Sequence, residues 1–184
     1  LPNSSNKTYS FYWGEYGTDQ ALITDYDKVD GSNDFGFLKP EQDSYKGTPY
    51  LPDDVSSWTN GALSDWDGKA NSNVLKGVTT GGGSYTSYAT AGHVLNTFLA
   101  SADAKGYDDW YIPSCGQLSL IYMHLTSVNN ALSAIGGQQL TKDYYLSSSE
   151  YDPENFWIVL FNNGRVFKRP KRLGCRVRFV RKIE

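Results

Sequence analysis

The pattern of apolar positions predicts helices in the middle of the chain. The first is expected over 90–102, where Thr90 is a residue type that caps helix N-termini. A second helix begins after Ser114, which has Gln117 three positions on and so forms a capping box. Its buried stripe is expected at Leu118, Ile121, Tyr122 and Leu125. A shorter helix is predicted over 128–135, ending at two adjacent glycines.

Short apolar runs predict strands on either side of these helices. They are expected at 10–13, 21–24, 35–38, 110–112, 144–151, 155–161, 165–169 and 175–183. The dipeptide Asn163–Gly164 is a strong signal for a type I′ hairpin turn. Such a turn sets Asn162 opposite Arg165, Phe161 opposite Val166, Leu160 opposite Phe167 and Ile158 opposite Arg169. Two main helices packed on an antiparallel sheet make an α+β fold.

The domain organisation follows from the same reading. The 184 residues are enough for one domain with a core of its own. Residues 65–184 hold the predicted helices and the C-terminal strands, whereas residues 1–64 are either first strands of the same domain or an extension. The Gly/Ser/Thr-rich stretch 77–88 is predicted to be a loop.

The C-terminal hairpin carries large apolar side chains on both faces. Alternation places Trp157, Val159, Phe161 and Val166 on the inward face. The outward face then holds Phe156, Ile158, Leu160, Phe167 and Arg169. Such a hairpin is either buried on both sides or presents an exposed apolar patch.

Charge separates the end of the chain from the rest. The net charge is −3, but residues 164–184 contain nine Lys/Arg and one Glu (+8), against eight Lys/Arg and nineteen Asp/Glu (−11) in 1–163. Pro170 is expected to interrupt strand pairing, so that 168–174 protrudes as a loop. Arg169, Lys171 and Arg172 would then flank the apolar patch. Apolar, aromatic and arginine side chains together are typical of a protein-binding hot spot, although a solvated basic loop is the plainer interpretation.

Several other functions find little support. Nucleic acid is disfavoured because the acidic remainder of the chain would repel a phosphate backbone. No apolar run reaches the length of a membrane span. The acidic stretch 25–31 fails as an EF-hand, and 65–73 could hold calcium or simply form turns, so calcium stays open and no other cofactor or metal is predicted.

Catalysis is not predicted either. His93 and His124 lie on predicted helices without a motif around them, and Ser147–Glu150 lacks a positioned base. Cys115 at a helix N-terminus could be a reactive thiol, and one disulfide between Cys115 and Cys175 stays open. The leading expectation is therefore that the protein is not an enzyme.

Four motifs in order resemble a known family. "DDWYIPSCGQLSLIY", "YYLSSSEY", "FWIVLFNNGRV" and "RVRFVRKI" are similar to bacterial and phage domains of the C-type lectin fold, in the branch related to formylglycine-generating enzymes. The resemblance covers about Asp65 to Ile183. It departs from the family pattern at Leu146, where Trp is usual, and the catalytic cysteines of the enzyme relatives have no match here.

Several proteins of this branch are variable proteins of diversity-generating retroelements, whose last hairpin and loop are rewritten at template adenines. AAY codons changed at their first two positions can encode Phe, Ile, Leu, Asp, Pro, Arg, Gly or Cys. Every outward or irregular position from 152 to 175 outside the lysines and Glu154 carries a residue of that set. Lys168, Lys171 and Glu154 do not belong to it.

The sequence therefore predicts a C-type-lectin-like domain that recognises a protein or glycan ligand on another cell, without nucleic acid and without membrane insertion by these residues. The resemblance implies a location outside the cell, on a cell or virion surface. The alternative is a surface adhesin or pilus-type subunit with one fixed ligand. The predicted binding residues are Asp152, Phe156, Ile158, Leu160, Arg165, Phe167, Arg169, Arg172 and Leu173.

Overall fold

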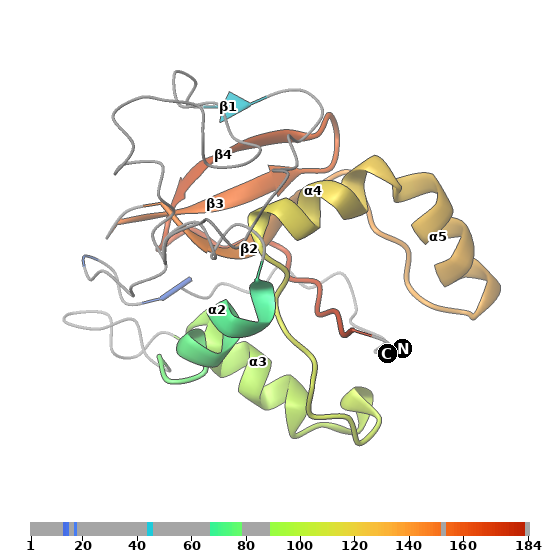
Figure 1. Cartoon of the computed structure of the whole chain (residues 1–184), viewed down its shortest axis with the longest axis horizontal. Helices are drawn as coiled ribbons and strands as arrows, with labels where there is room; N and C mark the ends of the chain where they lie inside the picture. The colour runs from blue at the N-terminus through green and yellow to red at the C-terminus, as the bar shows by residue number, and fades with distance from the viewer. Residues whose placement is uncertain are drawn as a thin grey trace.

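A computed structural model describes residues 13–14, 17, 44–45, 67–78, 89–151 and 154–182 (Figure 1). The strands predicted at 21–24 and 35–38, and most of the one at 10–13, lie outside the described residues. The helices are α2 (Gly68–Leu75), α3 (Ala91–Leu99), the 3-10 turn η4 (Ala102–Ala104), α4 (Cys115–Met123) and α5 (Leu125–Ala134). The strands are β1 (Ser44–Tyr45), β2 (Tyr144–Glu150), β3 (Asn155–Leu160) and β4 (Arg165–Pro170).

The fold is α+β, as predicted. Strands β2, β3 and β4 form an antiparallel sheet in the order β4-β3-β2, and the two-residue β1 pairs with the outer edge of β4. Helices pack on this sheet (Figure 1). None of the helices in the described ranges has the length and apolar character needed to cross a membrane.

Local sequence signals explain where the helices begin and end. The Thr90 hydroxyl accepts a hydrogen bond from the His93 amide at 3.2 Å, and Ser114 and Gln117 form the predicted capping box. Helix α5 begins three residues earlier than predicted, directly after α4. It ends as expected, because Gly136 takes a positive φ of 68° and lets the chain turn away.

Helix α2 was not predicted. It spans 8 residues and overlaps the stretch 65–73, whose Asp, Asn and Gly residues are typical of turns. The Asp67 carboxylate caps it by accepting a hydrogen bond from the Ala70 amide at 2.9 Å. Gly92 of α3 allows α3 to approach it closely, since a Cβ at this position would lie 1.7 Å from the Leu75 carbonyl oxygen.

The hairpin between β3 and β4 has a longer turn than predicted. The last pair is Leu160 with Arg165, so four residues form the turn, and Ile158 lies opposite Phe167 rather than Arg169. Only Gly164 in the turn has a positive φ, 74°, and its amide donates to the Leu160 carbonyl at 2.8 Å. The prediction of a type I′ turn is therefore wrong, because that turn needs a positive φ at both of its central residues. Because the register moves by two, each side chain stays on its predicted face.

The strand predicted at 175–183 is an extended segment that makes only isolated bridges within the described residues. Arg176 bridges Tyr145 of β2 in parallel, and Val180 bridges Tyr111. The segment leaves the edge of β2 after one bridge to reach the chain near residue 111, so no continuous ladder forms. Val177 and Phe179 pack inward.

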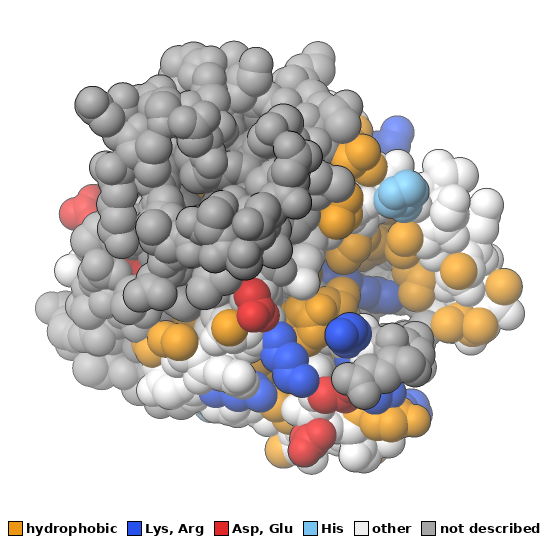
Figure 2. Space-filling model, in the orientation of Figure 1, with side chains coloured by type: hydrophobic (Ala, Val, Ile, Leu, Met, Phe, Trp, Pro, Cys, Tyr) orange, Lys and Arg blue, Asp and Glu red, His pale blue; other side chains and the backbone are white. Residues whose placement is uncertain are grey.

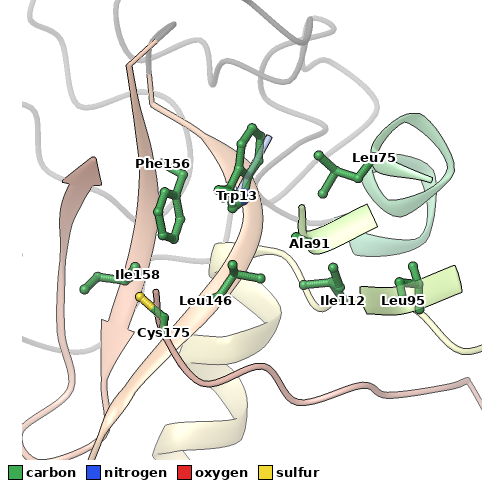
Figure 3. Close-up of a cluster of buried hydrophobic side chains, with 9 residues drawn as sticks. All are labelled: Trp13, Leu75, Ala91, Leu95, Ile112, Leu146, Phe156, Ile158 and Cys175. Atoms are coloured by element: carbon green, nitrogen blue, oxygen red, sulfur yellow. The ribbon is translucent and has the colours of Figure 1, made fainter. Parts of the chain in front are cut away.

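The sheet separates two hydrophobic cores. On one face, residues of α2, α3, β2 and β3 meet in the cluster Trp13, Leu75, Ala91, Leu95, Ile112, Leu146, Phe156, Ile158 and Cys175 (Figure 3). On the other face, α4 covers the cluster Cys115, Leu118, Leu140, Tyr145, Trp157, Val159, Phe161 and Val166. We call these the first and second clusters. Together they bury β3 on both sides.

Candidate binding surface

Two of the predicted binding residues belong to the core. Phe156 and Ile158 are fully buried, which makes their assignment to an exposed surface wrong. The ring of Trp13 stacks on Phe156, with centroids 5.8 Å apart and planes 12° apart. Ile158 lies beside Cys175 in the same cluster (Figure 3). Trp13 lies far from Phe156 in the sequence, so alternation within the hairpin could not reveal that it covers this ring.

The remaining residues of this face reach the surface. Arg165 and Arg172 are exposed, Leu173 keeps 43% of its surface accessible, and Leu160, Phe167 and Arg169 are half-buried. Asp152 lies outside the described residues. The outward face thus divides into a buried part near the start of β3 and an accessible part toward its end and on β4.

Aromatic and arginine side chains form a stacked group on the accessible part. Tyr144 and Phe167 meet edge to face, with centroids 5.9 Å apart. The Arg169 guanidinium lies 4.9 Å from the Tyr144 ring centroid, and the Arg165 guanidinium lies 5.9 Å from that of Phe167. Strands β2 and β4, which flank β3, supply these four residues. Flat, half-exposed groups on a rigid sheet can bind a ligand with little loss of conformational entropy.

Arg169 carries an unused donor in this group. Its Nη2 donates weakly to the Gly174 carbonyl at 3.4 Å, while its buried Nε has no hydrogen-bond partner among the described residues. Asp143 lies nearby and accepts a hydrogen bond from Arg176 Nε at 2.5 Å. Burial works against ionisation of Asp143, but the hydrogen bonds from Arg176 and from the Tyr144 amide, together with the positive charges of Arg176 and Arg169, outweigh it, so that the pKa of this carboxyl is lowered. Asp143 is thus committed to Arg176.

The segment after β4 does not protrude as predicted. Pro170 pairs with Asn155 at the end of the sheet, and the Lys171 amide donates to the Glu154 carbonyl at 2.8 Å. The Lys171 side chain is 0% exposed and forms an ion pair with the equally buried Glu150. Its ammonium also lies 5.1 Å from the Trp13 ring centroid. Lys171, which was predicted to flank the exposed patch, therefore belongs to the interior, because Trp13 and Glu150 enclose its side chain.

Glu150 ends a run of buried polar residues, Ser147–Glu150, that joins other elements to β2. Ser148 accepts a hydrogen bond from Asn71 of α2 at 3.2 Å, and Ser149 accepts one from the Cys115 amide at the start of α4 at 3.0 Å. The Ser147 carbonyl accepts the Trp13 indole N–H at 2.7 Å. We call this run the serine network. Its hydroxyls are occupied by structural contacts rather than arranged around a base.

The other candidate groups have structural surroundings. Cys115 and Cys175 are buried on opposite faces of the sheet and form no disulfide. Burial raises the pKa of the Cys175 thiol to about 12. Asp67 caps α2, and no group of three His, Cys, Asp or Glu side chains suited to a metal occurs within the described ranges.

Tyr144 is a surface residue that was not predicted. It is 37% exposed and pairs with Leu160 across β2 and β3. The sequence did contain a signal for this position, because alternation along β2 places Tyr144 on the same face as Leu146. Their partners on β3, Leu160 and Ile158, lie on that face as well. We call Tyr144, Leu160, Arg165, Phe167 and Arg169, with Arg172 and Leu173 beyond the strand end, the binding face. Comparison with known proteins gave no matching family model, curated protein or solved structure.

Proposed function

We propose that the protein recognises a ligand through the binding face. The observation that carries this proposal is the stacked group of Tyr144, Phe167, Arg165 and Arg169 on the accessible part of the sheet. Tyrosine and arginine are enriched among residues that dominate binding energy. Leu173 adds an exposed apolar side chain beyond the end of β4. The ligand is proposed to be a protein or glycan on another cell, and no catalysis is involved.

The proposed fold is C-type-lectin-like, with the protein outside the cell or on a virion. Support comes from the α+β architecture and from the capping-box helix packed on the sheet that contains the serine network. Each residue of the motif Ser147–Glu150 holds a different structural contact, which gives a physical reason for the motif to be kept in a scaffold. The proposal for the fold rests on these motifs and their order.

We further propose that the binding face is diversified. Its residues on β3, β4 and the following loop all carry types that altered AAY codons can encode, and all are at least partly accessible. Lys171, which such codons cannot encode, is buried in an ion pair with Glu150. Phe156, Ile158 and Cys175 are of permitted types but lie in the core. We therefore expect fewer positions to vary than the set of encodable residues alone would allow.

Deep sequencing of the 3′ end of this gene in its source population tests the diversification. We expect adenine-derived substitutions at Leu160, Arg165, Phe167, Arg169, Arg172 and Leu173. Lys171 and Glu150 should stay constant, and substitutions at Ile158 should stay apolar. A uniform 3′ end would overturn diversification and favour the alternative, a surface adhesin with a fixed ligand.

Ligand recognition itself is tested with arrays of glycans and surface proteins. The double variant Phe167→Ser/Arg169→Ser should lose the array signals of the wild-type chain, because it removes the centre of the stacked group. Lys182→Met, which removes an exposed positive charge elsewhere in the C-terminal segment, is the matched control. Signals that survive in the double variant would place recognition on another surface.

A further inference from the structure

The guanidinium of Arg169 has donors that the described fold does not use. Its Nη2 makes one long bond, to the Gly174 carbonyl at 3.4 Å, and its buried Nε has no hydrogen-bond partner among the described residues. Nη1 forms no hydrogen bond to these residues either, and it is not among the buried atoms. By contrast, Lys171, Arg176 and Arg181 each bind a carboxylate. Figure 2 shows the same mixing of basic and acidic side chains on one face of the molecule.

Asp143 does not serve as the carboxylate partner of Arg169. Its Oδ2 accepts a hydrogen bond from Arg176 Nε at 2.5 Å, and its Oδ1 accepts one from the Tyr144 amide at 2.8 Å. The positive charge of Arg169 acts on Asp143, but the two side chains form no ion pair in the described part of the chain. Two guanidinium groups, those of Arg169 and Arg176, therefore stand against one carboxylate. The excess of positive charge at this place attracts an anion.

The ring of Tyr144 holds the Arg169 guanidinium in place. The guanidinium lies 4.9 Å from the ring centroid, and the ring meets Phe167 edge to face. Tyr144 keeps 37% of its surface accessible, and its hydroxyl forms no hydrogen bond to the described residues. A charged donor on β4 and a hydroxyl on β2 thus lie close together on the binding face. Because stacking fixes the guanidinium, a ligand that binds it loses little conformational entropy.

We propose that the ligand of the binding face is an acidic glycan, in which the carboxylate of a hexuronic acid binds Arg169 and a sugar hydroxyl binds Tyr144. This inference rests on the proposed function of that face. The fork of Nη1 and Nη2 matches the two oxygens of a carboxylate. Leu160 and Phe167 are half-buried and offer little apolar area to a protein partner, which typically covers about 800 Å² on each side. Since Arg169 is a position proposed to vary, the preference for an acid belongs to this sequence rather than to the scaffold.

The test compares methyl β-D-glucuronide with methyl β-D-glucoside, which has a hydroxymethyl group in place of the carboxylate. Each is added at millimolar concentration to the full chain. We expect the glucuronide to shift the Nε–Hε NMR resonance of Arg169, and the glucoside to leave it nearly unmoved. N-acetylglutamate amide carries a carboxylate on a peptide unit and should shift it less, because it offers no sugar hydroxyl to Tyr144. An absent response to the glucuronide, or an equal response to the glutamate compound, would overturn the proposal.

Variants of the two proposed contacts assign the response to them. Arg169→Met should weaken glucuronide binding about tenfold or more, since hydrogen bonds to charged groups are the stronger ones. Arg169→Lys keeps the charge without the fork and should bind between the two. Tyr144→Phe should weaken the glucuronide roughly 2–10-fold and leave the glutamate compound unaffected. Lys182→Met removes a charge from an exposed position and should bind the glucuronide normally, and melting temperatures verify that all variants are folded. Equal binding by wild type and Arg169→Met would overturn the assignment.

The arrays of glycans and surface proteins keep this inference apart from the proposed function. If Phe167→Ser/Arg169→Ser loses signals that come from uncharged glycans or from proteins, the binding face stands and the acidic glycan is overturned. If signals survive in the double variant, the binding face itself is overturned. Signals confined to uronic-acid glycans and lost in the double variant would support both.

Discussion

Lys171 and Arg172 are neighbours of the same charge in opposite environments. Lys171 is fully buried, paired with Glu150 and placed against the Trp13 ring. Arg172 is exposed beyond the end of β4. The same contrast holds between the serine network, where polar groups join α2, α4 and Trp13 to β2, and the binding face, where half-exposed side chains stack mainly on one another. Composition alone does not distinguish a basic side chain that is buried in the fold from one that reaches the surface.

The contrast also explains why an acidic protein can carry a strongly basic end. Within the last twenty-one residues, Lys171, Arg176 and Arg181 each meet a carboxylate from an earlier part of the chain. These three cations tie the C-terminal segment to β2, to the residue before it and to the region of Asp109. Part of the positive charge is therefore a structural counterpart of the acidic remainder.

The largest expected effect comes from breaking the buried pair on one side only. Lys171→Met should lower the free energy of unfolding by about 3–5 kcal/mol, because it leaves the Glu150 carboxylate buried without this partner. Lys171→Met/Glu150→Leu should recover a large part of that loss. Arg172→Met should change stability by less than about 0.5 kcal/mol. Urea denaturation measures the free energy of unfolding of all three variants. Equal losses of stability in Lys171→Met and Arg172→Met would contradict the contrast between the buried and the exposed side chain.

The next largest loss of stability is expected at one of two apolar residues that pair across β3 and β4. Ile158→Ala should cost about 2–5 kcal/mol, since it empties space in the first cluster. Phe167→Ala should cost less, because its ring is half-buried, while it should abolish ligand signals on an array. Stability and binding are measured on the same preparations. An Ile158→Ala protein with wild-type stability would return Ile158 to the binding face.

The smallest effect concerns the far end of the C-terminal segment. Arg181 donates to Asp109 Oδ2 at 3.1 and 3.2 Å and stacks 3.6 Å from the Tyr107 ring centroid. The hydrogen bond from Arg181 lowers the pKa of Asp109 in the folded protein. The pair therefore contributes fully above the unfolded pKa of about 3.9 and is lost as pH falls through the lower folded value.

An NMR titration of the Val180 amide, which bonds to Tyr111, follows that loss. Arg181→Met should move the midpoint of Asp109 up toward its ordinary range, whereas Lys182→Met should leave it unchanged. An unchanged midpoint in Arg181→Met would show that Arg181 does not hold Asp109 ionised.

Features that depend on residues within one element were predicted correctly from the sequence. Thr90 and Ser114 cap their helices through side-chain contacts three residues away, and alternation assigned the faces of the hairpin even though the turn was longer than predicted. Both features depend on neighbours in sequence, so the sequence contains the information directly. Helix α2 was missed because its turn-like composition hides a short capped helix.

Features that depend on distant residues were not predictable. The burial of Phe156 follows from Trp13, and the burial of Lys171 follows from Glu150 and Trp13 together. No periodicity within 155–175 distinguishes a face covered by the chain from one left to solvent. The site was therefore placed on the right strands, but its boundary was wrong where long-range packing decides it.

The position of Trp13 has a consequence for how the chain acquires its structure. Its indole N–H bonds to Ser147, 134 positions away, and its backbone amide bonds to the Lys171 carbonyl. During synthesis these partners emerge from the ribosome long after the tryptophan, so its indole stays in water until they have been made. Its fluorescence should respond late in refolding, after the helices have formed, and a chain shortened before residue 171 should leave it solvated.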